Sequence, residues 1–245
     1  MQGWYGLSDE ELEFQINDRL SFQQFLGFPN FIPDYSTIWR FREELADGNL
    51  TDKIWNELQR QINEKNISIE KGVIQDATFI IAEPGKTDSG MNNRGQMSKT
   101  SRNRDGSWTK KGKKSYFGYK AHTKMRRGSK IIEELAVTTA RIHDGKIDLA
   151  SSDDIIYRDK GYAGCKTIAK GDGTMKRGNL SVDSFLRNKR IESKRSQGEH
   201  PYGTIKRAMH GGQTRLTTVY RVFVQQLFVF MAYNIYRLAT IKGAM

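Results

Sequence analysis

The sequence has almost no cysteine, and this scarcity excludes two kinds of stabilisation. Cys165 is the only thiol among 245 residues, so no disulfide can form within the chain and no cysteine-based zinc site can be built. A lone cysteine fits a reducing compartment, and we expect the protein to be cytoplasmic. Proline is also scarce, at four residues, while aromatic residues reach 11%, which is typical of a folded globular protein.

Export signals and long uninterrupted apolar runs are missing too. The first residues, MQGWYGLSDEELEFQ, carry acids where a secretory signal has a basic head and an apolar core. The most apolar stretch, residues 219–238, is interrupted by arginine, glutamine and asparagine, which a lipid-exposed span would not tolerate cheaply. We therefore interpret it as a buried helix and expect no membrane partner.

Acidic and basic side chains are unevenly distributed along the chain. Residues 1–70 hold 6 basic and 13 acidic side chains, although the whole chain has a net charge of +12. Residues 86–130 hold 14 lysines and arginines against two acids, and residues 160–221 hold 14 against four. A merely soluble basic surface is the plain alternative, but this concentration favours a polyanionic partner for the downstream part of the chain.

Periodicity predicts a small helical N-terminal domain over residues 1–70. Apolar residues recur at helix spacing over 8–26 and 36–58, and Ser8 and Ser36 are the expected N-caps. The connection FLGFPNFIPDYS fits either a helix-turn-helix or ordinary helix packing, and the acidity of this region favours packing.

Residues 71–245 predict an α/β domain, a mixed sheet flanked by helices. A helix is expected to begin at Asp144, and residues 85–114, rich in glycine, serine and lysine, predict a basic loop. After residue 164 the pattern is irregular until two C-terminal helices. The expected strands are 73–81, 116–125, 131–139 and 154–158, and the expected C-terminal helices are 199–206 and 217–240.

Three carboxylates stand out from the other acids by their positions. Asp76 lies in the middle of VIQDATFII, where a carboxylate among aliphatic residues is costly unless a metal or another cation balances it. Asp159 ends the fourth strand beside a glycine-rich turn, where open α/β sheets place ligands. Glu199 begins a helix, with Arg195 and Lys206 within about two turns of it. Phosphoryl transfer by metal ions held on carboxylates needs this kind of set.

Other polar residues have both a functional and a structural interpretation. Lys120 and His122 in GYKAH either help to grip a polyanion or form an exposed pair on a strand. Asp144, next to His143, is more often a helix cap than half of an acid–base dyad. Trp108 either stacks on a ligand or anchors its loop. The lysines beside it are candidates for the same polyanion surface: Lys110, Lys111, Lys113 and Lys114.

Four motifs together resemble one family. DAT on a strand, SYFGYKAH, DKGYAG and R-x3-E-x6-K look like insertion-sequence DDE transposases with an RNase H-like catalytic domain, and LSDEELEFQINDRLSFQQFLGF resembles their helical N-terminal domain. The resemblance implies metal-dependent cleavage and strand transfer of double-stranded DNA. It assigns Asp76, Asp159 and Glu199 to Mg²⁺, with Mn²⁺ as an alternative, and Arg195 and Lys206 to DNA phosphate. It further implies a homodimer in the synaptic complex and association with the nucleoid.

The sequence departs from the family pattern at two places. Glu192 stands where relatives often have a tyrosine, three residues before the arginine, so the role of that position stays open. Relatives usually carry a longer helical region before the segment that begins here, so we expect a shortened copy. Three alternatives also stay open: an inactive, transposase-derived DNA-binding protein, a recombinase with a serine or tyrosine nucleophile, and an RNase H-type nuclease.

Overall fold

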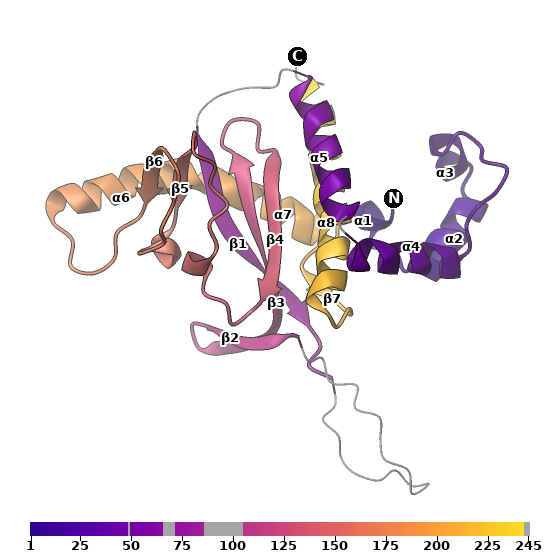
Figure 1. Ribbon diagram of the computed structural model, residues 1–245, viewed down its shortest axis with the longest axis horizontal. Helices are drawn as coiled ribbons and strands as arrows, with labels where there is room; N and C mark the ends of the chain where they lie inside the picture. The colour runs from indigo at the N-terminus through magenta and orange to yellow at the C-terminus, as the bar shows by residue number, and fades with distance from the viewer. Residues whose placement is uncertain (49, 66–71, 86–104, 243–245) are drawn as a thin grey trace, which may run out of the picture.

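The computed structural model describes residues 1–48, 50–65, 72–85 and 105–242, which form a group of N-terminal helices and a helix-flanked sheet (Figure 1). The N-terminal helices extend to one side of the molecule, and the sheet lies on the other. A long C-terminal helix runs between them (Figure 1).

Within the described residues 1–48 and 50–65, five helices precede the sheet. The predicted cap at Ser8 is confirmed, since its hydroxyl accepts a hydrogen bond from the Glu11 amide at 3.1 Å. The second cap is Asp34 and not the predicted Ser36, because the Asp34 carboxylate accepts from the Thr37 amide at 2.7 Å. Extended backbone at Arg19 divides the helix expected over 8–26 into two, and extended backbone at Gly48 ends the first of two helices where one was expected over 36–58. The helices are α1 (Gln2–Tyr5), α2 (Asp9–Asp18), α3 (Leu20–Phe25), α4 (Tyr35–Asp47) and α5 (Leu50–Asn63).

The described residues form a seven-stranded sheet with the order β2-β3-β1-β5-β6, in which β4 is paired to β3 and β7 to β1. The β1–β3 pair is antiparallel and the β1–β5 pair is parallel, so the predicted mixed α/β fold and its four strands are confirmed. The strands are β1 (Val73–Ala82), β2 (Ser107–Lys111), β3 (Lys114–Arg126), β4 (Ile132–Thr139), β5 (Ile155–Arg158), β6 (Gly171–Thr174) and β7 (Gln213–Thr214).

Three expectations for the chain after residue 71 were also wrong. The helix expected from Asp144 is a single 3-10 turn, η1 (Asp144–Lys146). The basic stretch after residue 164 contains β6 and a helix, α6 (Val182–Arg195), and is therefore not irregular throughout. The basic loop 85–114 ends in β2, which pairs with the start of β3, and its residues 86–104 lie outside the described part of the chain.

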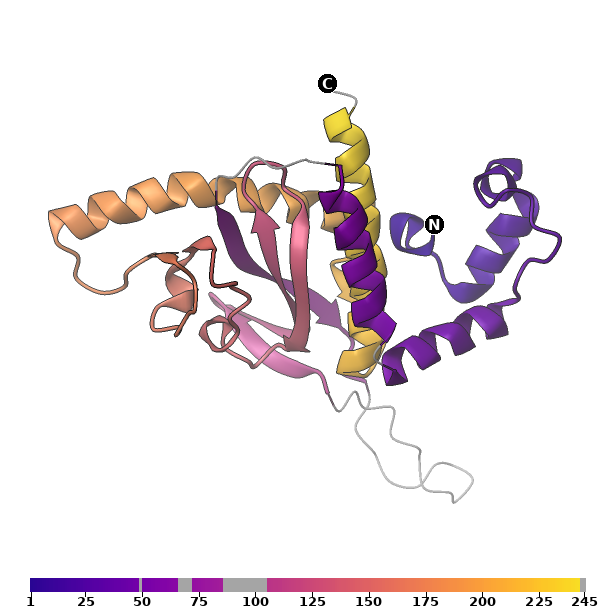
Figure 2. The same cartoon turned by 45° about the horizontal axis from the view of Figure 1, so that its top comes forward.

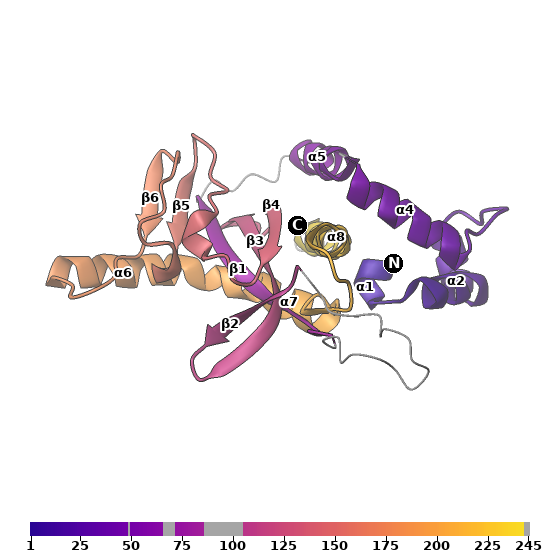
Figure 3. The ribbon, with the colours of Figure 1, turned by 60° about the horizontal axis from the view of Figure 1, so that its bottom comes forward.

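Helices cover one face of the sheet. α6, the 3-10 turn η3 (Ser196–Gly198) and α7 (Glu199–Ala208) follow one another as a nearly continuous rod behind the strands (Figure 2). α8 (Val219–Lys242) lies between the sheet and the N-terminal helices, where its buried Val222, Leu227 and Phe230 join the main core (Figure 3). Among the described residues, no helix is both long and apolar enough to cross a membrane.

The edge strand β4 is covered by side chains from two helices. Asn234 of α8 accepts a hydrogen bond from the Ile132 amide at 2.9 Å and donates one to the Ile132 carbonyl at 2.8 Å. Gln59 and Trp55 of α5 donate to the carbonyls of Ile132 and Glu133. These contacts satisfy edge groups that would otherwise offer a template for further strand pairing, and they attach α5 and α8 to the sheet.

Candidate active site

The register of two parallel strands places Asp76 and Asp159 at the same level. Val73 is paired with Ile156 and Ile74 with Tyr157 on β1 and β5, so two residues further along each strand come Asp76 and Asp159. Extended backbone continues through Asp159, which forms the N-cap of the 3-10 turn η2 (Lys160–Tyr162). Side chains alternate between the two faces of a sheet, so both carboxylates emerge on one face.

Asp76 is partly buried and paired with a cation. Its Oδ2 lies 3.1 Å from Nη2 of Arg195, the last residue of α6, and its Oδ1 accepts the Ala77 amide at 2.9 Å. Burial raises the pKa of Asp76 from 3.8 to about 6, the Asp159 and Asp144 carboxylates push it in the same direction, and Arg195 opposes the rise. The site therefore concentrates negative charge that one arginine balances in part.

A tyrosine and a threonine form the layer beside Asp76. Thr123 on β3 is opposite Asp76 in the antiparallel register, and its hydroxyl lies 2.6 Å from the Tyr202 hydroxyl on α7. Burial raises the pKa of Tyr202 well above its ordinary value, so the phenol stays protonated at neutral pH. Sequence reasoning missed this pair, although Tyr202 stands three residues after Glu199 and thus on the same helical face.

A glycine brings η3 close to the sheet. A β-carbon on Gly198 would lie 3.1 Å from Cγ2 of Ile74, so a larger residue would push the turn away from β1. Glu199 follows directly, exposed at the start of α7. Among the described residues its carboxylate forms no ion pair or hydrogen bond, and no three His, Cys, Asp or Glu side chains are placed together to hold a metal ion.

Asp144 lies near the two aspartates, a position that sequence reasoning did not assign to it. A β-carbon built on Gly161 would lie 2.7 Å from Asp159 Oδ1 and 3.6 Å from Asp144 Oδ2, so both carboxylates border the same turn. The expected cap role is wrong for Asp144, because the ring of His143 caps η1 by accepting the Gly145 amide at 3.1 Å. The motif HDG carried no signal of this proximity, which arises from the packing of η1 against η2.

The GYKAH residues are not an exposed pair. His122 is 0% exposed, and its Nε2 lies 2.8 Å from the Thr138 hydroxyl. Burial lowers the pKa of His122 to about 4, which keeps the ring neutral at neutral pH. The expected contact between His122 and DNA is therefore corrected. Lys120 is mostly buried and donates to the Ile142 carbonyl at 2.9 Å and to Asp144 Oδ1 at 2.8 Å.

Apart from Lys120, the predicted DNA-binding lysines whose side chains the structure describes lie on the surface. Trp108 is exposed and packs edge-on against Phe117, with ring centroids 5.4 Å apart. The prediction for the Lys111 side chain lies outside what the structure describes. Glu192 is exposed on α6, facing solvent where relatives often carry tyrosine. The exposed lysines are Lys110, Lys113 and Lys114 on the β2–β3 hairpin and Lys206 on α7.

Comparisons with known proteins agree with this geometry. Residues 1–44 match a family described as Transposase domain (DUF772), and residues 68–235 match one described as Transposase DDE domain. A search of solved structures found no match. The second family match covers more than half of the chain and spans the helix-flanked mixed sheet, which has the RNase H-like arrangement. The chain therefore belongs to the insertion-sequence DDE transposases.

Proposed function

We propose that this transposase cleaves and rejoins DNA strands with Asp76, Asp159 and Glu199, which hold a divalent metal ion, Mg²⁺ or Mn²⁺. One observation carries the proposal: Asp76 and Asp159 follow the paired ends of neighbouring strands at one level, with Arg195 against Asp76. Carboxylate oxygens are the ligands that such hard cations prefer. The two aspartates therefore fit a divalent ion, which would balance the negative charge between them.

Glu199 completes this set from one helical turn beyond Arg195. The backbone at Arg195, Ser196, Gly198 and Glu199 is right-handed helical, and four residues of helix advance about 6 Å and return to the same face. The Glu199 side chain is exposed, so its rotation would displace no packed group. In this proposal Glu199 joins the two aspartates when metal binds.

The residues around the aspartates supply position and charge. A bound divalent ion supplies Lewis-acid activation of the attacking oxygen and stabilisation of the leaving one. Arg195 brings a guanidinium to the place where a scissile phosphate would lie, and guanidinium groups pair well with phosphate. Tyr202 holds Thr123 in place behind Asp76. This chemistry needs no protein nucleophile, so no covalent protein–DNA intermediate forms.

The DNA contacts belong to the same proposal. The exposed lysines of the β2–β3 hairpin and Lys206 on α7 form basic surface for double-stranded DNA. Lys120 acts indirectly, by holding Asp144 beside Asp159. We assign residues 1–70 to the N-terminal domain and 71–245 to the catalytic domain, and we expect a homodimer to hold the two element ends.

The test is metal-dependent cleavage of a labelled duplex that carries the DNA flanking the reading frame. Wild-type protein should nick it with Mg²⁺ or Mn²⁺, and Asp76→Asn, Asp159→Asn and Glu199→Gln should each abolish nicking. Asp183→Asn, which changes an exposed acid at the start of α6, is the matched control and should cleave normally. Cleavage that survives in the Asp76→Asn and Asp159→Asn variants would refute the proposal.

A second candidate function is DNA binding without catalysis. The exposed position of Glu199, which forms no contact with either aspartate among the described residues, favours it. In that case the wild type binds the duplex with steep salt dependence but never nicks it, and the three variants bind as the wild type does. The same denaturing gel decides between the two, and it also reveals any covalent adduct of a serine or tyrosine recombinase.

A further inference from the structure

The backbone ladder between β1 and β5 stops before it reaches the two aspartates. The last pair is Ile74 with Tyr157, and the next level along the strands is occupied by Gln75 and Arg158. A side-chain bridge replaces the ladder there, since Arg158 donates from Nε at 3.0 Å and from Nη2 at 2.8 Å to Gln75 Oε1. This bridge is the last direct link between the strands before Asp76 and Asp159.

The bridge is buried on the face of the sheet opposite the aspartates. Gln75 and Arg158 are both 0% exposed, and the guanidinium of Arg158 also lies 5.7 Å from the centroid of the Tyr162 ring in η2. Buried charges persist when they are paired and hydrogen-bonded. The carboxylate that pairs with Arg158 is Asp148, which contacts Nη2.

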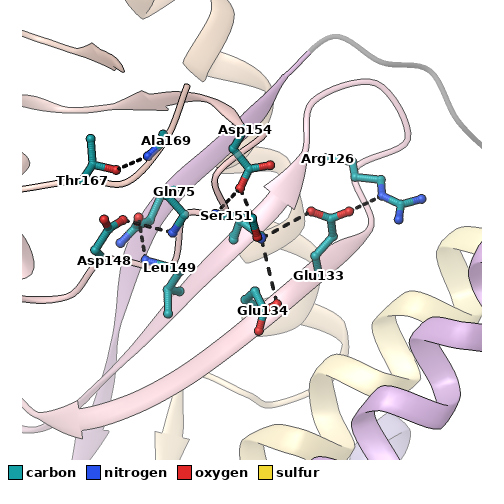
Figure 4. Close-up of polar contacts among 12 residues, drawn as sticks. Gln75, Arg126, Glu133, Glu134, Asp148, Leu149, Ser151, Asp154, Thr167 and Ala169 are labelled. Carbon is teal, nitrogen blue, oxygen red and sulfur yellow. Dashed lines mark hydrogen bonds and ion pairs between the residues drawn. The ribbon is translucent and has the colours of Figure 1, made fainter. Parts of the chain in front are cut away.

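The segment that carries Asp148 is itself bound to the bridge. Gln75 donates to the Ile147 carbonyl at 2.7 Å and accepts the Leu149 amide at 3.2 Å, so residues 147–149 lie against β1 (Figure 4). The three side chains form one unit, which we name the register clamp: Gln75, Asp148 and Arg158. Each of the two site aspartates directly follows a member of this clamp in the sequence.

A second ion cluster on the same face of the sheet has similar chemistry to the register clamp. Its residues are not next to Asp76 or Asp159 in the sequence, so it serves as a control. Asp154 accepts from the buried Lys124 at 3.3 Å and from the Ser151 amide at 2.7 Å, much as Asp148 accepts from Arg158 and from the Ala150 amide at 3.0 Å (Figure 4). Lys124 lies on β3 and Asp154 precedes β5, so this cluster does not join the ends of β1 and β5. It shares the burial and the charge of the register clamp but not its position.

We propose that the register clamp is a positioning device that holds Asp76 and Asp159 at the spacing a shared metal ion requires. The inference rests on the proposed function of these two carboxylates. Gln75, Asp148 and Arg158 touch neither metal nor DNA in this scheme, and they act through the strand ends that carry the ligands. Residues that orient metal ligands in this indirect way commonly change metal affinity about 10- to 100-fold when they are mutated.

The experiment compares Mn²⁺ affinity, measured by calorimetry on the full chain, in Asp148→Asn and Asp154→Asn. Both variants neutralise a carboxylate bound to a buried cation, and urea unfolding records how much each is destabilised. We expect Asp148→Asn to weaken Mn²⁺ binding about 10- to 100-fold and Asp154→Asn to leave it unchanged at comparable stability. Arg158→Lys, which keeps the charge but loses the fork that spans Gln75 and Asp148, should weaken binding in the same way.

Three results would overturn the inference, the first two by assigning the register clamp to stability and the third by removing the metal site. Wild-type Mn²⁺ affinity in folded Asp148→Asn or Arg158→Lys, or equal losses in Asp148→Asn and Asp154→Asn, would show that the register clamp serves stability alone. Absence of Mn²⁺ binding in the wild type would refute the proposed metal site first, and the positioning role with it. Should Asp148→Asn fail to fold, the Arg158→Lys measurement decides.

Discussion

Replacing Asp76 by asparagine should make the metal-free protein more stable at neutral pH. Burial, assisted by the Asp159 and Asp144 carboxylates, raises the pKa of Asp76 from 3.8 to about 6 in the folded state. Between these two values the folded protein binds more protons than the unfolded chain, so the free energy of unfolding falls as the pH rises through this window. Asparagine has no proton to lose, and the variant escapes this fall.

The size of the effect follows from the same pKa values. A rise from 3.8 to about 6 corresponds to about 3 kcal/mol, at about 1.4 kcal/mol for each pH unit. The side chain is 21% exposed, so solvent screening reduces this figure, and we expect a gain of about 1–3 kcal/mol above pH 6. Below about pH 4 the two proteins should differ little, because both carry a neutral side chain there.

Urea unfolding in EDTA at pH 4, 5, 6 and 7.5 measures the difference in the free energy of unfolding between Asp76→Asn and the wild type. Asp34→Asn is a control of opposite sign, because hydrogen bonds from Thr37 and Ser36 hold the pKa of Asp34 below its ordinary value. The stability that Asp34 contributes is present above its unfolded pKa and is lost as the pH falls. The reasoning would be refuted if the difference in the free energy of unfolding between Asp76→Asn and the wild type did not change with pH. It would also be refuted if Asp76→Asn were less stable than the wild type at pH 7.5.

Three further substitutions test the packing by urea unfolding at pH 7.5. Gly118→Ala should lower the free energy of unfolding by about 3 kcal/mol or more. Gly118 has a φ of +153°, and a β-carbon there would lie 2.0 Å from the Ile80 carbonyl oxygen. A decrease below about 1 kcal/mol would contradict this. Ser8→Ala should cost about 1 kcal/mol through the lost cap of α2, and an unchanged midpoint would argue against the cap. Thr123→Val should cost about 1–3 kcal/mol by leaving the Tyr202 hydroxyl unpaired, and adding Tyr202→Phe should recover part of it.

The sheet could be predicted because its strands are apolar and differ in period from the helices. β1 and β5 are runs rich in aliphatic residues, and α8 is long and apolar enough to be assigned from composition. α6 was missed because its apolar pattern is short: Val182, Phe185 and Leu186 stand at helical spacing, but of residues 187–195 only Ile191 is apolar. β6, with the sequence GDGT, becomes a strand through its pairing with β5 and not through any local preference.

Part of the candidate site could be recognised from the sequence of the strands. Asp76 and Asp159 were identifiable because a carboxylate within or at the end of a buried strand needs a compensating partner. The position of Asp144 beside them depends on how η1 packs against η2, and the contact of His122 with Thr138 depends on the pairing of β3 with β4; neither is a local property of the sequence. The metal-binding roles of Asp76, Asp159 and Glu199 all stay predictions.

In the proposed function, the contact between Arg195 and Asp76 makes metal binding precede the pairing of Arg195 with DNA phosphate. The guanidinium of Arg195 lies 3.1 Å from Asp76, and its buried Nε has no hydrogen-bond partner in the described part of the chain, so Arg195 faces the carboxylate and keeps one N–H donor unused. In the proposed function Asp76 would hold a divalent ion, and the attraction between Arg195 and Asp76 would then be weaker. Arg195 would thus be free to pair with DNA phosphate once the metal is bound. A site built from aspartates alone would repel DNA before the metal arrived, and the α6 terminus supplies the positive charge that prevents it.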